Sequence, residues 1–497
     1  MFEIMGSGLS LLDFDGDGDL DVYFVQAGNP MHPAQGGLLR NESLEFVDVT
    51  QESGLLSIGL GQASIAADFD GNGWCDLYLS NLGVNELWLN QNGRFVQERS
   101  LVGFDDWTVG VTVLDFDRDG WLDLYVCGYV AIDLEHSKVC LNENSRRDYC
   151  GPRSFEPVKD LLLKNQGAGV FEDATQRLGN QIALPALSAA SADFDNDGWP
   201  DIYVANDNAP NVLWMNKGDG SFINEAMIRG CALNWSGTAE ASMGVAVADF
   251  DHNGWLDILV AHMDGETNTL YSNTGNGQFI DASASSGLGG PSLRHTAWSP
   301  IVADFDGNGW LDIYVTNGGM EIYNGWQGRD RPSDLREPNQ LFLNRGHGVF
   351  ELDLTFYGQH DKAGWDNSRG AAVGDLDNDG DLDVIYSNNN GPSVLLVNEL
   401  MVHGDWIGLD LRTASDNVAY GAVVHFLGRD GMVMRYVHAS SGYASSGDSR
   451  IQMYLSPMSS ISGIEVIWPS GVVGHVEDLP RNRYVTWKEG WPPRLDL

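Results

Sequence analysis

Residues 249–257 read DFDHNGWLD and carry the pattern from which most of this chain is built. Side chains with oxygen atoms stand at positions 1, 3, 5 and 9 of this nonapeptide, and glycine stands at position 6. The same pattern begins at seven places, which we number acidic loops 1 to 7: Asp13, Asp68, Asp115, Asp193, Asp249, Asp304 and Asp375. A pattern that recurs seven times indicates a repeat architecture.

The spacing of the loops predicts the fold. Successive loops begin 55, 47, 78, 56, 55 and 71 residues apart, and about 50 residues is the size of a four-stranded propeller blade. An alternating apolar strand follows the loops, as in residues 311–315, and a Gly-x-Gly-x-Phe turn leads into a last strand, as in residues 275–279. We therefore expect an all-β chain with a seven-bladed β-propeller in residues 1–400. A solenoid is the alternative, but its repeats are usually shorter.

The residue types in the loops indicate a hard cation. Alternate spacing turns four oxygen-bearing side chains toward one point, and the carbonyl of position 7 can join them, as Ca²⁺ requires. An EF-hand is excluded, because position 12 is apolar in all seven loops and an EF-hand needs Glu there. Mg²⁺ fits less well because it keeps its waters. Turn formation alone explains one such loop, whereas seven filled loops predict up to seven structural Ca²⁺ ions whose binding is linked to folding.

The predicted metal ligands are grouped by position in the loop. Position 1 is Asp13, Asp68, Asp115, Asp193, Asp249, Asp304 and Asp375. Position 3 is Asp15, Asp70, Asp117, Asp195, Asp251, Asp306 and Asp377. Position 5 is Asp17, Asn72, Asp119, Asp197, Asn253, Asn308 and Asp379. Position 7, through its carbonyl, is Asp19, Trp74, Trp121, Trp199, Trp255, Trp310 and Asp381, and position 9 is Asp21, Asp76, Asp123, Asp201, Asp257, Asp312 and Asp383.

The charge of the chain agrees with this prediction. The 70 acidic residues outnumber 28 Lys and Arg, which gives a formal net charge of -42 and a pI near 4.3. Such a chain repels nucleic acids and anionic membranes, and its self-repulsion calls for bound cations. No apolar run approaches the length of a membrane span. No signal peptide is visible either, and we expect the natural N-terminus to lie upstream of Met1.

Five cysteines allow one or two disulfide bonds and a spare thiol: Cys75, Cys127, Cys140, Cys150 and Cys231. Cys140 and Cys150 lie in a polar stretch, which suits a loop-closing disulfide in an oxidising compartment. Two free thiols are the alternative, and the pairing of the other three cysteines stays open.

The repeats resemble the FG-GAP or VCBS-type calcium propeller, a family that includes the integrin α head and cartilage acidic protein. After Asn398 the pattern changes. The runs SGY (residues 441–443) and WPSG (residues 468–471) resemble an ASPIC/UnbV domain, which we place at 401–490 as a small β-domain before a tail at 491–497. The combination is characteristic of cartilage-acidic-protein-like proteins. It implies a secreted or surface calcium-binding protein, and some relatives are associated with calcium-dependent ring formation in natural-product pathways.

A ligand is expected on the face opposite the acidic loops. Both long insertions, residues 128–159 and 318–338, follow the second strand of a blade and therefore lie on that face. Candidate contact residues on the same face are Trp107, Trp235, Arg294, His295, Trp298, Trp326, Trp365 and Arg369. Aromatic and polar groups on long loops suit a glycan, a protein or a small molecule. The alternative is that these tryptophans pack between blades.

Recognisable catalytic motifs are absent from the sequence. We therefore expect an extracellular, periplasmic or cell-surface binding protein. The alternative is a calcium-dependent enzyme acting on the same face, either a small-molecule cyclase or a polysaccharide-cleaving enzyme.

The number of residues before the first acidic loop leads to an expectation about the number of strands in blade 7. Only twelve residues precede Asp13, which is too few for a strand that would complete the last blade. Blade 7 should therefore have three strands, with an unpaired outer edge near Val394 to Asn398. The C-terminal domain could cover that edge.

Overall fold

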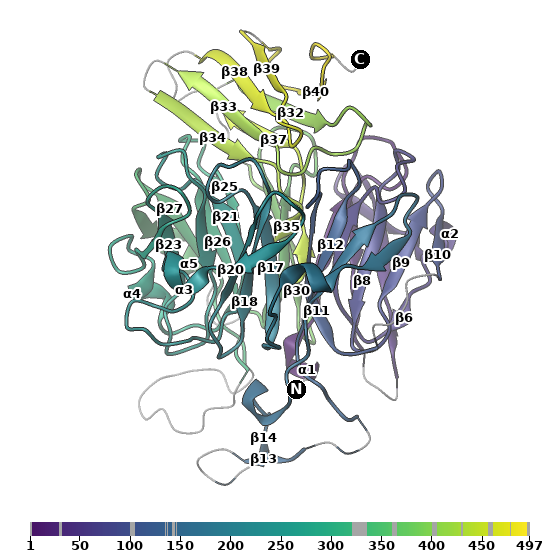
Figure 1. Cartoon of the computed structure of the whole chain (residues 1–497), viewed down its shortest axis with the longest axis vertical. Coiled ribbons are helices and arrows are strands. Elements are labelled where there is room, and N and C mark those ends of the chain that lie inside the picture. Colours follow the sequence, from purple (N-terminus) through teal and green to yellow (C-terminus); the bar gives the residue numbers. More distant parts are fainter. Residues whose placement is uncertain are drawn as a thin grey trace.

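The computed structural model describes residues 2–28, 32–99, 105–134, 136, 138–141, 145, 147–320, 335–359, 365–399, 405–428, 431–455, 461–477 and 479–494. Seven antiparallel sheets stand around one axis, and a smaller β-domain lies against one end of the ring (Figure 1). The predicted all-β propeller is confirmed.

Each blade contains strands that follow one another along the chain. Blade 1 is β1 (Leu9–Leu12), β2 (Asp21–Phe24), β4 (Gly37–Glu42) and β5 (Glu45–Asp48). Blade 2 is β7 (Gly61–Ala67), β8 (Asp76–Asn81), β9 (Glu86–Asn90) and β10 (Phe95–Glu98). Blade 3 is β11 (Thr108–Leu114), β12 (Asp123–Gly128), β15 (Leu161–Asn165) and β16 (Phe171–Asp173).

The later blades repeat this order. Blade 4 is β17 (Ala186–Ala192), β18 (Asp201–Asn206), β19 (Val212–Asn216) and β20 (Phe222–Asn224). Blade 5 is β21 (Val245–Ala248), β22 (Asp257–Val260), β23 (Thr269–Asn273) and β24 (Phe279–Asp281). Blade 6 is β25 (Ala297–Ala303), β26 (Asp312–Asn317), β27 (Gln340–Asn344) and β28 (Phe350–Leu352). Blade 7 is β29 (Ser368–Gly374), β30 (Asp383–Asn388) and β31 (Val394–Leu396).

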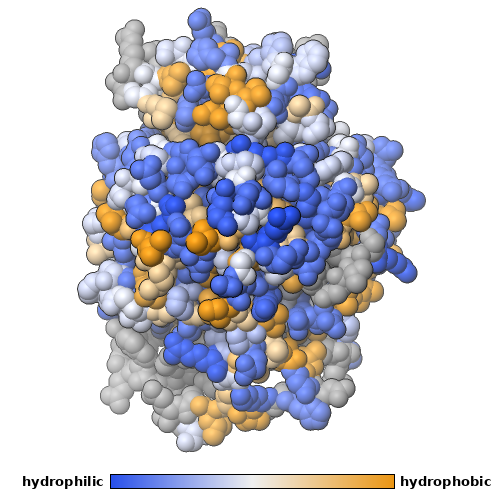
Figure 2. Space-filling model, in the orientation of Figure 1, coloured by the Kyte–Doolittle hydropathy of each residue, from blue (hydrophilic) through white to orange (hydrophobic). Residues whose placement is uncertain are grey.

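Short elements lie before, within and between the blades. They are α1 (Phe2–Met5), β3 (Ala34–Gln35), α2 (Thr50–Ser53), β6 (Ile58–Gly59), β13 (Cys140–Leu141), β14 (Arg147–Asp148), η1 (Pro152–Ser154), η2 (Thr175–Leu178), α3 (Ala226–Arg229), α4 (Gly289–Ser292) and α5 (Leu354–Gln359). None of the described helices is long and apolar enough to cross a membrane. Figure 2 shows mostly hydrophilic residues over the propeller, with hydrophobic residues scattered among them.

In the part of the chain that the structure describes, the ring closes without a strand shared between its two ends. Among the described residues, the sheet of blade 7 has three strands, β29, β30 and β31, as predicted. Closure instead uses a side chain: Asn41 Nδ2 in blade 1 donates to the carbonyl of Leu376 in blade 7 at 2.7 Å. Six further asparagines at the same position each donate to the preceding blade, and we call all seven the ring asparagines: Asn41, Asn90, Asn165, Asn216, Asn273, Asn344 and Asn398.

The C-terminal domain contains two sheets. One is formed by β32 (Trp406–Arg412), β37 (Ile451–Tyr454) and β40 (Tyr484–Lys488), and the other by β33 (Val423–Gly428), β34 (Gly431–Tyr436), β38 (Ile461–Ile467) and β39 (Val473–Val476). Buried apolar residues such as Leu409, Phe426 and Trp468 fill the space between them. The domain lies on the end of the ring that carries the acidic loops, which we call the loop face (Figure 1).

Part of this domain enters the propeller axis. The axial hairpin, β35 (Ser440–Ser441) with β36 (Ser445–Ser446), pairs with β1 through the bridge between Ser10 and Ser446. Its backbone also bonds to inner strands of other blades: Ser188 Oγ donates to Gly442 O at 3.0 Å, and Tyr443 N donates to Ser299 Oγ at 3.0 Å. The C-terminal domain therefore forms the centre of the propeller as well as a cover for one end.

Glycines make room for this hairpin. A Cβ atom on Gly8 in blade 1 would lie 1.7 Å from the carbonyl oxygen of Ala444, and one on Gly442 would lie 2.0 Å from Ser299 Oγ. Gly442 also has a positive φ of 55°, which favours glycine. Gly442, in the middle of the SGY run, is thus a geometric requirement of the axis.

Candidate functional site: acidic loops and the opposite face

Each acidic loop is closed by bonds to its own backbone. In loop 1, the position-1 carboxylate of Asp13 accepts the N–H groups of Gly16 at 2.8 Å and Gly18 at 3.1 Å. The position-5 carboxylate of Asp17 accepts the N–H of Asp19 at 2.9 Å. Bonds from position 6 to position 1 and from position 7 to position 5 recur in all seven loops. The loops therefore share one geometry.

The position-9 aspartate ties each loop to its blade. Asp21 accepts the N–H of Phe14 at 3.1 Å and the N–H of Asn41 at 2.8 Å, and equivalent pairs recur in every loop. The second donor is always the backbone of a ring asparagine. The position-9 carboxylate therefore holds its own loop and also the ring asparagine that contacts the preceding blade.

The loops bring carboxylates together as a metal site requires. In loops 1 to 5, three carboxylates place oxygen atoms within 4.8 Å of one another. At position 3, the Oδ1 atoms of Asp15, Asp117 and Asp195 are buried and accept no hydrogen bond within the described part of the chain. A buried carboxylate oxygen without a partner is costly, so a cation among these atoms fits the arrangement. Geometry and donor type suit Ca²⁺, which binds six to eight oxygens.

Burial makes these carboxylates hard to ionise without a cation. It raises the pKa of Asp21 to about 7 and those of Asp76 and Asp312 to about 8, while the hydrogen bonds they accept lower it. Neighbouring loop carboxylates raise it further by repulsion. A divalent ion reverses this balance because it stabilises the charged form.

The C-terminal domain contacts the loops directly. Tyr484 OH donates to Asp375 Oδ2 at 3.0 Å, and Tyr454 OH donates to Asp381 Oδ1 at 2.8 Å. Arg435, which is buried, donates to the carbonyl of Gly309 at 3.0 Å. These contacts join the loop face to the domain above it, and sequence reasoning did not identify them.

Three ligand-face candidates lie in the interior. Trp107 and Trp298 are 1% and 0% exposed, and their indole N–H groups donate to Gln62 Oε1 and to the carbonyl of Gly318. Arg369 is also buried; its guanidinium lies 4.1 Å from the ring centre of Trp298 and donates to the carbonyl of Ile4. Trp107 and Trp298 thus pack inside the protein, the alternative considered from the sequence, and Arg369 links blade 7 to the chain start.

The other candidates are dispersed. Trp235 is 81% exposed and Arg294 is exposed, whereas Trp365 and His295 are partly buried. His295 Nδ1 lies 4.0 Å from Glu337 Oε2. Trp326 lies outside the described residues.

The face opposite the loops, which we call the insertion face, contains a cavity of about 1010 Å³ between blades 7 and 1. Gln26, Gln35, Asn367 and Tyr149 line it, together with the turn of residues 387–393. Sequence reasoning named none of these residues. For the turn of residues 387–393, the sequence does offer a signal, the run of three asparagines at 388–390.

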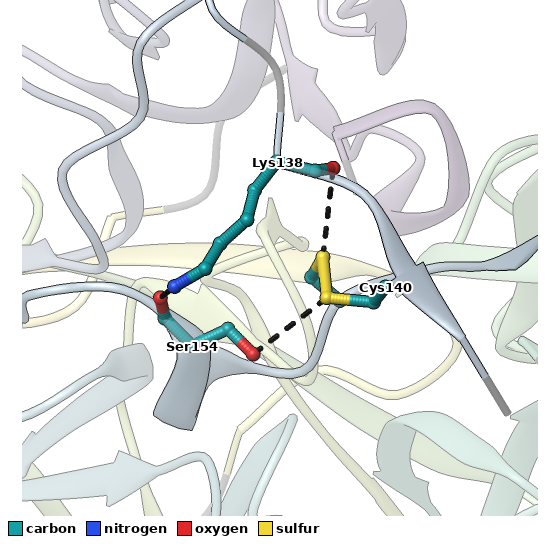
Figure 3. The surroundings of a disulfide bond; sticks show 4 residues. Lys138, Cys140 and Ser154 are labelled. Carbon is teal, nitrogen blue, oxygen red and sulfur yellow. Dashed lines mark hydrogen bonds between the residues drawn. A yellow bond between two sulfur atoms is a disulfide. The ribbon is translucent and has the colours of Figure 1, made fainter. Parts of the chain in front are cut away.

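The disulfide predicted as one of two alternatives is present. Cys140 and Cys150 are bonded, with their Cα atoms 5.2 Å apart. Figure 3 shows the bond beside Lys138, whose ammonium donates to the carbonyl of Ser154. This disulfide closes the insertion between β12 and β15. Cys75, Cys127 and Cys231 are free thiols in the structure.

A ring of blades with an acid-rich loop in each defines a β-propeller whose loops are suited to calcium. The chain belongs to the family described as FG-GAP-like repeat, whose profile matches more than half of it, at residues 13–79, 68–126, 154–204, 193–260 and 249–315. A second profile, described as ASPIC and UnbV, matches residues 412–492. The predicted family is confirmed.

Relatives of the chain include cartilage acidic protein 1. The Homo sapiens protein is 25% identical over 484 residues, which are 93% of this chain and 60% of that protein. The Xenopus tropicalis protein is 28% identical over 335 residues, which are 65% of this chain and 48% of that protein. The chain thus spans less than two thirds of these curated relatives. Among solved structures, an Agrocybe aegerita lectin described as recognising non-reducing terminal N-acetylglucosamine has a TM-score of 0.42 and 18% identity, covering 79% of this chain and 95% of that one.

Proposed function

We propose that this protein is an exported, calcium-stabilised binding protein that recognises its ligand on the insertion face. One observation carries the proposal: the C-terminal domain lies over the loop face and enters the axis, while the insertion face holds a large polar cavity. Calcium then has a structural role at one end of the ring, and recognition takes place at the other.

The lining of the cavity favours a polar ligand. Gln26, Gln35, Asn367 and Asn389 bring amide groups, each able to donate and accept hydrogen bonds, and Tyr149 adds an aromatic ring with a hydroxyl. Amide and aromatic groups together suit a ligand with many hydroxyl groups and an apolar sugar face. We therefore propose a glycan as the ligand class.

The disulfide and the calcium loops support export. The Cys140–Cys150 bond closes an insertion on the same face, and such bonds persist in oxidising compartments. Modules that bind Ca²⁺ at about 10⁻⁴–10⁻³ M suit extracellular calcium. Detection of the protein in the cytoplasm of its source cells, with both thiols reduced, would contradict this part of the proposal.

A glycan-array and small-molecule screen in the presence of Ca²⁺ tests the binding function. For any glycan found, we expect Gln26→Ala and Asn389→Ala to weaken binding at least tenfold. Trp235→Ala, at an exposed residue that does not line the cavity, should leave affinity unchanged. Binding that survives both cavity substitutions would place recognition elsewhere. Turnover of a screened compound would instead support the alternative, a calcium-dependent enzyme on this face.

A further inference from the structure

A lysine side chain forms ion pairs with two carboxylates of loop 3. Lys164 lies on β15, directly before the ring asparagine Asn165. Its ammonium is 2.8 Å from Asp119 Oδ2 and also contacts Asp117 Oδ2. These carboxylates are positions 5 and 3 of the loop, and both are predicted metal ligands. The Lys164 side chain is only 21% exposed, so the pair of contacts is partly shielded from water.

The equivalent residue differs in the other loops. The residue before the ring asparagine is Arg40, Leu89, Met215, Ser272, Leu343 or Val397. Five of these side chains carry no charge. The sixth, Arg40, is directed to Glu42, with Nε 3.1 Å from Oε1. The geometry of the repeat therefore does not require a cation that binds the loop from this position. Among the equivalent residues, Lys164 is the one that forms such ion pairs in the described structure.

Among the described ion pairs, two other cations contact a ligand carboxylate, and each contacts only one. Arg229 lies 3.2 Å from Asp195 Oδ2 in loop 4, and Arg345 lies 3.7 Å from Asp306 Oδ2 in loop 6. In the described structure, neither arginine forms an ion pair with the position-5 side chain of its loop. Lys164 is the described side chain that joins positions 3 and 5.

The carboxylates of loop 3 reflect this contact. In loops 1 and 4, the carboxylates within 4.8 Å of one another are those of positions 1, 3 and 5. In loop 3, which also has aspartate at position 5, they are those of Asp115, Asp117 and Asp123. Asp119 is not in this group, and its Oδ2 is bonded to Lys164 instead.

We propose that Lys164 is the resident cation of loop 3, so that this loop stays closed without Ca²⁺ and the chain binds six Ca²⁺ ions rather than seven. An ammonium at this place takes an oxygen from two of the ligands and repels an incoming divalent ion. Asp117 Oδ1 still lacks a hydrogen bond, but one free oxygen does not replace the two that Lys164 holds.

The consequence concerns the insertion face. Blade 3 carries the disulfide-closed insertion between β12 and β15. If its loop depends on Lys164, this blade keeps its shape when calcium falls, while the other blades loosen. The inference rests on the proposed calcium binding.

Counting bound Ca²⁺ by native mass spectrometry and equilibrium dialysis of the full chain at about 10 mM free Ca²⁺, about tenfold above the weaker end of the expected Kd range, tests the inference. We expect six ions for the natural chain, seven for Lys164→Met and Lys164→Gln, and six for Lys164→Arg, which keeps the charge. Ser272→Lys places an ammonium at the same position of loop 5 and should reduce the count to five. Circular dichroism checks that each variant is folded.

The outcomes separate the two proposals. Seven ions in the natural chain would overturn the role of Lys164 and leave calcium binding intact. A count of six that stays at six in both Lys164→Met and Lys164→Gln would also overturn it. No bound Ca²⁺ in any variant would refute the calcium assignment on which the inference rests.

Discussion

Asn41 and Leu376 are 335 residues apart in the sequence, yet the Asn41 side chain donates to the Leu376 carbonyl at 2.7 Å. This bond joins blade 1 to blade 7, where the described sheets share no strand. The same Asn41 amide donates to Leu20 O, and its Oδ1 accepts from Leu44 N at 2.7 Å. One buried side chain thus contributes to closing the ring and also fixes a turn of its own blade.

The first prediction concerns this seam. Asn41→Ala should destabilise the protein by about 1–3 kcal/mol, because buried groups lose their partners, and should speed amide exchange in β1 and β29. Asn90→Ala is the matched control, since it removes the same bond between blades 1 and 2, which the chain also connects. Hydrogen exchange followed by mass spectrometry measures both. Equal exchange in β29 in the two variants would show that the seam does not depend on Asn41.

The second prediction concerns calcium. At a free Ca²⁺ concentration of 100 times Kd, each filled site should stabilise the chain by about 2.7 kcal/mol. Removal of Ca²⁺ with a chelator should therefore lower Tm, and re-addition should restore it. Mg²⁺ at the same concentration should restore less, since it keeps its waters. A calorimetric Tm that ignores chelator and Ca²⁺ alike would contradict calcium binding.

The third prediction concerns the axial hairpin. Gly442→Ala places a side chain 2.0 Å from Ser299 Oγ at a residue with φ of 55°. The left-handed backbone alone costs about 1–3 kcal/mol, and the clash adds to it. Since the hairpin touches several blades, we expect unfolding of the whole chain at a lower Tm rather than loss of the C-terminal domain alone. Gly37→Ala, where a Cβ meets nothing within 4 Å, is the control.

Differential scanning calorimetry distinguishes the outcomes for Gly442→Ala. A Tm unchanged from that of Gly37→Ala would show that the hairpin does not need glycine there. Two separate transitions, with the propeller melting as in the natural chain, would show that the propeller does not need the hairpin.

The fourth prediction concerns pH. Burial lowers the pKa of His262 from 6.5 to about 3, and its Nδ1 lies 3.6 Å from Glu240 Oε2. Between these values the unfolded chain binds a proton that the folded chain does not, so the stability that neutral His262 contributes is lost as pH falls from about 6.5 toward 3. Each pH unit in that window costs about 1.4 kcal/mol.

Chemical denaturation of the natural chain and of His262→Gln at pH 7 and pH 5.5 measures this effect. Acidification also weakens the calcium sites, but it does so equally in both proteins, and saturating Ca²⁺ is kept throughout. The natural chain should lose about 1 kcal/mol more than the variant. An equal loss would mean that His262 becomes protonated in the folded state.

Much of the fold could be predicted because the residues that define each blade lie close together in the sequence. The loop, the strand that follows it and the Asn-x-Leu-aromatic-x-Asn run lie within one repeat, and short-range spacing determines how they pair. The three strands expected in blade 7 are the three that its described sheet contains. The candidate ligand face was less predictable, because Trp107 and Trp235 look alike in sequence, yet one is 1% and the other 81% exposed.

By itself, the sequence determined the seven acidic loops, the number of blades and the family, since these depend on residue types at fixed short spacing. Only the tertiary structure decided that Tyr443 lies in the propeller axis, that Arg369 is buried against Trp298, and that Lys164 contacts Asp119. The physical reason is distance along the chain. Such partners are tens to hundreds of residues apart. Lys164 and Asp119 meet when blade 3 folds, Arg369 and Trp298 meet when blades 6 and 7 pack together, and Tyr443 reaches the axis only when the C-terminal domain docks on the ring, so no local spacing encodes these contacts.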